Sequence, residues 1–311
     1  MTYNSNNFSF IFGLEKKQNQ LDFIDINLYK KDNLLFIDPR LTSHNSDKFS
    51  KEMDKYLRKY WSNLISEIKK ENISQVFKLM KGLAEPKETH LGFSEKKQRG
   101  NSVGNKLKPQ FIKELYKLIN NRNSHVTHLE DIEFFIDRIG EDRISDITTK
   151  IVKQVLIDFT IEECKKHNLT TQTFLQKDIW NFETGEWESK FVDLPSFDNK
   201  PIILVPKNIV RLRGGSKNII SCFYRFAIRE YVLNDSKLLE EIFPTGKNGQ
   251  HLSKDIKNHF PISKEILGKW NNQYPKLMVD FKSAYLTDKV TCLSDEKIEM
   301  IVYETYYEKV G

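Results

Sequence analysis

The stretch from Asp142 to His167 constrains the fold most, because it predicts a long amphipathic helix that needs a core to pack against. Its apolar residues recur at three- and four-residue spacing, which aligns them on one face of a helix: Ile144, Ile147, Ile151, Val152, Val155, Leu156 and Phe159. Residues 129–139 repeat the pattern upstream, and Gly140 followed by Asp142 predicts a left-handed helix end and a new cap. We therefore expect a helix, a sharp turn and a longer helix.

The composition is that of a globular chain with a sizeable core. Hydrophobic residues make up 39% and aromatic residues 12% of the 311 residues, unlike the aromatic-poor composition of disordered chains. No apolar run reaches the roughly 18 to 20 residues that span a bilayer, and no signal-peptide core follows the polar N-terminus. The cysteines are widely separated and are expected as free thiols. We expect a cytoplasmic protein without a membrane partner.

The local patterns predict an α+β fold with a largely helical middle. Short strands are expected over 8–12, 21–28 and 34–37, and Lys48 to Lys70 has helical spacing. Residues 179–192 predict a β-hairpin around the turn Glu183-Thr184-Gly185, and residues 201–206 predict a buried strand between prolines. We expect two lobes packed as one unit, an N-terminal lobe over 1–170 and a C-terminal α+β lobe over 171–311.

The charge is distributed unevenly, and this points to an acidic partner. No acidic residue occurs between Asn199 and Arg229, whereas seven cations fall in that window. An uncompensated basic segment of this kind is typical of binding to nucleic-acid phosphates. The candidate nucleic-acid-binding residues are Lys207, Arg211, Arg213, Lys217, Arg225 and Arg229.

The start of the helix expected at 218–233 strengthens this prediction. Ser216 can cap the helix, and the amides freed at a helix start bind anions. Arg211, Arg213 and Lys217 stand close to it in sequence. A cationic surface loop without a ligand is the alternative interpretation. Residues 83–108 form a second, long basic loop that is either a phosphate cradle or a surface linker.

Two sets of carboxylates suit divalent metal. Asp142, Asp146 and Lys150 are separated by four residues each and share the helix face opposite the isoleucines. Acids of the preceding helix could join Asp142 and Asp146 to hold Mg²⁺ or Mn²⁺ for phosphate hydrolysis. The alternative is a solvated face held by ion pairs such as that of Asp146 with Lys150.

The second set lies on the expected hairpin. Asp178 precedes its first strand, and Glu188-Ser189-Lys190 lies on its second. One large nuclease superfamily holds magnesium and a catalytic lysine with an acid and an acid-x-lysine on adjacent strands. The candidate catalytic residues are therefore Asp142, Asp146, Glu188 and Lys190, with Asp142 and Asp146 as metal ligands.

Parts of the middle of the chain resemble a known family. Residues 85–94 (EPKETHLGFS), 99–104 (RGNSVG) and 139–149 (IGEDRISDITT) are similar to a family of largely uncharacterised bacterial proteins associated with phage-defence gene neighbourhoods. The resemblance implies a role in defence and supplies no catalytic residues. We therefore expect a nucleic-acid-acting component of anti-phage defence, a metal-dependent nuclease among the options. The alternative is a non-enzymatic subunit that binds DNA, RNA or other subunits of a defence complex.

Overall fold

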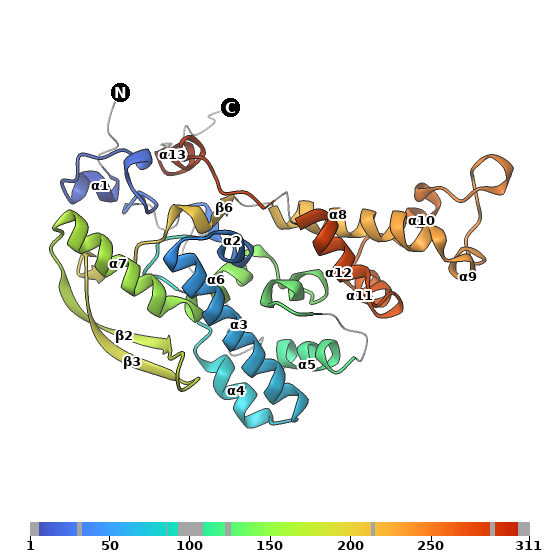
Figure 1. Cartoon of the computed structure of the whole chain (residues 1–311), viewed down its shortest axis with the longest axis horizontal. Helices are drawn as coiled ribbons and strands as arrows, with labels where there is room; N and C mark the ends of the chain where they lie inside the picture. Colours follow the sequence, from blue (N-terminus) through green and yellow to red (C-terminus); the bar gives the residue numbers. More distant parts are fainter. Residues whose placement is uncertain are drawn as a thin grey trace. The chain divides into compact units, whose positions relative to one another are not determined.

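The computed structural model describes residues 6–29, 33–84, 86–92, 108–121, 126–212, 215–286 and 290–303, without the side chains of residues 215–218 and 286. The chain divides into two compact units, each formed by segments far apart in sequence (Figure 1). Unit 1 comprises Met1–Lys108, Glu141–Arg213 and Thr291–Gly311, and unit 2 comprises Pro109–Gly140 and Gly214–Val290. Helices form the bulk, with small antiparallel sheets, so the predicted α+β class is confirmed.

The units differ from the lobes expected at 1–170 and 171–311. The hairpin that follows residue 170 packs on helices that precede it, and the chain returns to unit 1 at its C-terminal end. Contacts between distant segments set these boundaries, and local sequence patterns do not encode them.

Unit 1 is built on α3 (Lys48–Lys69), the helix predicted at 48–70. Asp47 caps it by accepting a hydrogen bond from the Ser50 amide, and Met53, Tyr60 and Leu64 are among the residues of its buried face. The shorter helices of unit 1 are α1 (Phe8–Ile11), α2 (Pro39–His44), α4 (Ile73–Lys81) and α13 (Asp295–Tyr303), with the 3₁₀ turns η1 (Gln18–Gln20) and η3 (Lys207–Ile209).

The predicted long helix over 142–167 is two helices. α6 (Glu141–Ile151) and α7 (Lys153–His167) are separated at Val152, whose φ of −90° and ψ of 10° leave the helical range. Asp142 lies inside α6 and does not cap it. Gly140 is not left-handed; Arg138 has the positive φ, 63°. The break lets α6 pack against the strand β1 (Leu35–Ile37) while α7 packs along the β-hairpin.

The N-terminal strands were largely predicted wrongly. Residues 8–11 are helical, and the amide and hydroxyl of Ser9 donate to the Asp25 carboxylate. Of the described residues before and within this helix, only Asn7 forms a bridge with the segment 21–28, at Asn27. Residues 21–28 are extended but form only isolated bridges, one of them between Phe23 and Pro206. Of the three strands expected at 8–12, 21–28 and 34–37, the described residues contain only the third, as β1, and it pairs with the distant β6 (Val210–Leu212).

The β-hairpin is confirmed and is longer than predicted. β2 (Gln172–Trp180) and β3 (Trp187–Leu194) are antiparallel, with a bulge between Gln176 and Ile179. Gly185 in the turn has a φ of 71°, which glycine adopts without strain. The predicted strand at 201–206 is only partly a strand. β5 (Lys200–Pro201) pairs with β4 (Ser196–Phe197), and residues 202–205 are buried without a ladder.

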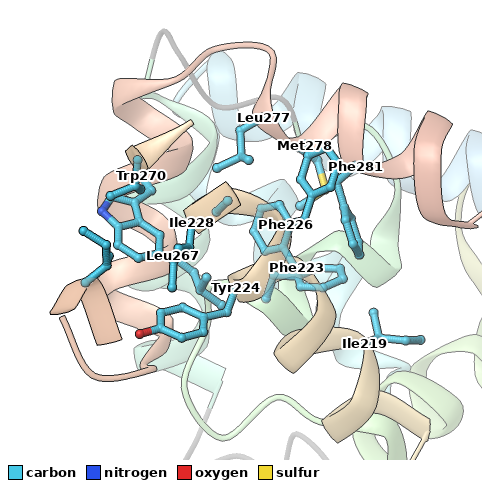
Figure 2. Packing of buried hydrophobic residues seen from close by; sticks show 14 of the residues in the cluster. Ile219, Phe223, Tyr224, Phe226, Ile228, Leu267, Trp270, Leu277, Met278 and Phe281 are labelled. Atoms are coloured by element: carbon cyan, nitrogen blue, oxygen red, sulfur yellow. The ribbon is translucent and has the colours of Figure 1, made fainter. Parts of the chain in front are cut away.

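Unit 2 is helical and has an aromatic core. Phe223 and Phe226 of α8 (Gly215–Glu230) face Met278 and Phe281 of α12 (Leu277–Phe281) (Figure 2). Its other elements are α5 (Lys108–Ile119), α9 (Ser236–Leu239), α10 (Ser253–His259), α11 (Lys264–Gln273), η2 (Leu129–Phe134), η4 (Val232–Asn234), η5 (Lys247–Gly249) and the π-helix η6 (Lys282–Leu286). The helix predicted over 129–139 is therefore only the 3₁₀ turn η2 followed by an irregular turn.

Among the described residues, no helix is both long enough and apolar enough to cross a membrane.

Candidate functional site

Unit 1 contains a cluster of charged side chains beside the hairpin, formed by Lys150, Lys153 and Glu88, which we call the buried ion cluster. Lys150 of α6 and Lys153 of α7 are only 4% and 2% exposed, although lysines are almost never fully buried without a partner. The Lys153 ammonium lies 2.7 Å from Glu88 Oε1 and donates to the Lys177 carbonyl of β2 at 3.2 Å. The cluster therefore joins α6, α7, the hairpin and the segment that carries Glu88.

The charges of this cluster shift its protonation equilibria. Burial acts to raise the pKa of Glu88, but the charge and hydrogen bond of Lys153, together with Lys150 and a backbone hydrogen bond, bring it below its ordinary value. Burial, and then the charge of Lys153, lower the pKa of Lys150, while Glu88, Asp178 and Asp146 act to raise it. A lysine in such surroundings gives up its proton more readily than a solvated lysine does.

The segment that carries Glu88 is held by backbone hydrogen bonds. The Glu88 carbonyl accepts from the Ile203 amide at 2.8 Å, and the His90 carbonyl accepts from the Asn33 amide at 2.8 Å. This segment belongs to the long basic loop predicted at 83–108, of which residues 85 and 93–107 lie outside the described residues. Sequence reasoning missed the cluster, because two lysines three residues apart are usual on a solvated helix face.

Within the described part of unit 1, Asp142 and Asp146 belong to no group of three side chains whose ligand atoms converge on one point. Asp142 is exposed, and the charge of Asp146 acts to raise the pKa of Lys150. Among the described residues, only one group of three places its ligand atoms within 4.8 Å of one another, that of His128, Glu130 and Asp131 in unit 2. There the Lys282 ammonium already lies 2.6 Å from Asp131 Oδ2 and acts as its counter-ion.

The hairpin set is partly assembled. Glu188 and Lys190 of β3 form an ion pair at 2.6 Å, and this pairing is the largest effect lowering the pKa of Glu188. Asp178 lies in the bulge of β2 with a φ of 53°, and its charge acts on Lys108 and Lys150. The Lys190 ammonium also donates to Gln154 of α7 at 3.1 Å.

Two predicted phosphate contacts of unit 1 have internal counter-ions. The Lys207 ammonium lies 2.8 Å from Asp295 Oδ1 at the start of α13. The Arg211 guanidinium lies 2.7 Å from Asp38 Oδ2, and Asp38 also caps α2 through the Arg40 amide. These pairs neutralise two of the seven cations in the window from Asn199 to Arg229, which we call the acid-free window.

Two cations of α8 in unit 2 differ from Lys207 and Arg211 in their exposure and surroundings. Arg225 and Arg229 are exposed and one helical turn apart, and within the described part of the chain neither has a carboxylate within 4.0 Å. Arg225 Nε donates to the Ser221 carbonyl of the same helix at 3.1 Å. Arg213 and the side chain of Lys217 lie outside the described residues, as does the side chain of the predicted cap Ser216.

Comparison with known proteins identifies a family without an assigned activity. The family model described as "Domain of unknown function (DUF8370)" matches residues 13–216, more than half of the 311-residue chain. The chain therefore belongs to this family. No curated protein and no solved structure is detectably similar to it. The matched residues include the buried ion cluster and the hairpin, whereas α8 continues beyond them.

Proposed function

We propose that this member of the DUF8370 family is a cytoplasmic, nucleic-acid-acting component of bacterial anti-phage defence that contacts the phosphate backbone through α8. The single observation that carries the proposal is the pair Arg225 and Arg229, exposed on one helix in unit 2. Guanidinium groups bind phosphate oxygens through their planar set of donors. Arginines one turn apart on a helix lie on the same face and can contact one strand together.

The family resemblance of the middle of the chain supports the defence context, and the exposed arginines support the partner. Backbone contacts alone carry no sequence information, so the proposal covers DNA and RNA alike. Other subunits of a defence complex are further proposed partners.

Metal-dependent cleavage with Mg²⁺ or Mn²⁺ is the second candidate function. It is favoured by the Glu188–Lys190 ion pair on the strand that faces the bulge containing Asp178. In such a reaction, carboxylates hold the metal and a lysine stabilises charge on the phosphate. If cleavage fails, the remaining candidate is a non-enzymatic subunit that binds nucleic acid and leaves catalysis to another chain.

A phage challenge tests the proposed defence role. Cells that express the protein together with its native neighbouring genes should form fewer plaques than cells with an empty vector. Charge reversal at Arg225 and Arg229 should remove this protection without lowering the amount of protein. Protection that persists in the doubly reversed variant would exclude a role for these arginines in defence.

A further inference from the structure

The C-terminal helix α13 is attached to unit 1 at both ends. At its start, Asp295 approaches the Lys207 ammonium with both carboxylate oxygens, at 2.8 Å and 3.1 Å. At its end, the Tyr303 hydroxyl donates to Asp25 Oδ2 at 2.7 Å. Ile298 and Val302 between these points are fully buried. The contacts hold a helix that is remote in sequence between Lys207 at its start and Asp25 at its end.

The contacts around Lys207 make Asp295 its counter-ion. The Lys207 amide donates to the Asp22 carbonyl at 3.1 Å, so the backbone of η3 is fixed. Asp22 itself is paired with Lys166, which leaves Asp295 as the carboxylate in direct contact with the Lys207 ammonium among the described residues. Cys292, just before α13, lies 3.1 Å from the Asn208 carbonyl through its Sγ atom.

The strength of this ion pair permits competition. Its members are 26% and 27% exposed, so water reaches the pair and salt screens it in part. A nucleic acid presents many phosphates along its backbone, and one of them can replace a single carboxylate. A phosphate can therefore compete with the Asp295 carboxylate for the Lys207 ammonium.

We propose that α13 is an internal competitor of nucleic acid, with Asp295 held on Lys207 where a backbone phosphate oxygen would bind. This inference rests on the proposed function, because it concerns the regulation of nucleic-acid binding by the window from Asn199 to Arg229. That window contains both Lys207 and the two arginines of α8. When Asp295 leaves Lys207, the Lys207 ammonium can contact one backbone phosphate. When Asp295 is bound to Lys207, that contact is lost. A partner that displaces α13 would thus raise the affinity of the protein for nucleic acid.

Fluorescence anisotropy with a short labelled oligonucleotide tests the inference. Asp295→Asn should bind about two- to five-fold more tightly than the wild type at about 0.1 M salt. Its log-log salt dependence should be steeper by about 0.7 to 0.9, the contribution of one further phosphate contact. Glu296→Gln is the matched control, because it removes the same charge from the next, exposed residue of α13.

A double-mutant cycle then identifies the cation through which Asp295 acts. The gain from Asp295→Asn should disappear in a Lys207→Gln background. A gain that persists there, or a gain equal to that of Glu296→Gln, would overturn the inference while leaving the proposed function intact. If neither the wild type nor Asp295→Asn binds nucleic acid at low salt, the proposed function fails and the inference fails with it.

Discussion

Glu88 is the residue on which the buried charge of unit 1 depends most directly. It is the carboxylate that contacts the Lys153 ammonium, and Lys153 is 2% exposed. Glu88→Gln should lower the free energy of unfolding by about 3 to 5 kcal/mol, because it leaves a buried ammonium without its counter-charge. Urea unfolding measures this loss, and Glu186→Gln, at an exposed acid of the hairpin turn, is the control. A loss no larger than that of the control would show that the pair is not buried as described.

Asp25 and Glu88 are predicted to change the stability of the fold in opposite directions as pH rises. Burial raises the pKa of Asp25, whose facing groups Ser9, Tyr303 and Asn7 are neutral donors that only partly offset it. The carboxyl therefore stabilises the fold fully below its unfolded pKa of about 3.9, and the contribution is lost as pH rises through the folded pKa. The pKa of Glu88 is lowered, so its contribution is present above about pH 4.3 and is lost as pH falls through the folded pKa.

Urea unfolding between about pH 3 and pH 7 tests these signs. The stability of wild type minus that of Asp25→Asn should decrease as pH rises, whereas that of wild type minus Glu88→Gln should increase. Equal slopes for the two differences would contradict the described environments.

At the scale of elements, the hairpin is anchored on α4 by a close contact. The Trp187 indole donates to the Leu79 carbonyl at 2.7 Å, and a Cβ added at Gly82 would lie 2.2 Å from Trp187 Cδ2. Gly82→Ala should therefore displace the indole and destabilise unit 1 by about 1 to 3 kcal/mol. Gly140→Ala is the matched control, because nothing lies within 4 Å of its added Cβ. A Gly82→Ala variant as stable as that control would refute this packing.

The elements show what sequence patterns predict and what they miss. α3 and the hairpin were predicted because their apolar spacing and turn residues are local signals. The break at Val152 was missed because Val152 continues the apolar pattern of α6 into α7. The pairing of β1 with β6 joins residues more than 150 positions apart, and a register set by such tertiary contacts has no local signature.

The candidate site likewise has one part that the sequence predicts and one part that it does not. The acid-free window was visible as a charge pattern, and two of its cations were found to be ion-paired at Asp38 and Asp295. A sequence pattern cannot identify a partner more than 80 positions away, nor can it tell a buried lysine such as Lys150 from a solvated one.

At the scale of the whole molecule, the metal-dependent reaction is tested by cleavage of a nucleic acid. Mg²⁺ or Mn²⁺ should support cleavage and chelation should stop it. Alanine at Glu188 or Lys190 should abolish cleavage, and alanine at Asp142 or Asp146 should do so if the helix acids hold the metal, in each case with unchanged urea unfolding. Cleavage that survives all four substitutions would exclude both predicted sites, and absence of cleavage would favour the binding subunit.

The central claim is that α8 of unit 2 contacts the phosphate backbone. The salt dependence of nucleic-acid binding by the whole protein tests this claim most directly. The double reversal Arg225→Glu and Arg229→Glu should weaken binding and reduce the log-log slope by about 1.4 to 1.8, as expected when two phosphate contacts are lost. Lys254→Glu with Lys257→Glu makes the same change in net charge at exposed positions of α10 and should reduce the slope less. Equal slopes for the two double variants would contradict the assignment of backbone binding to α8.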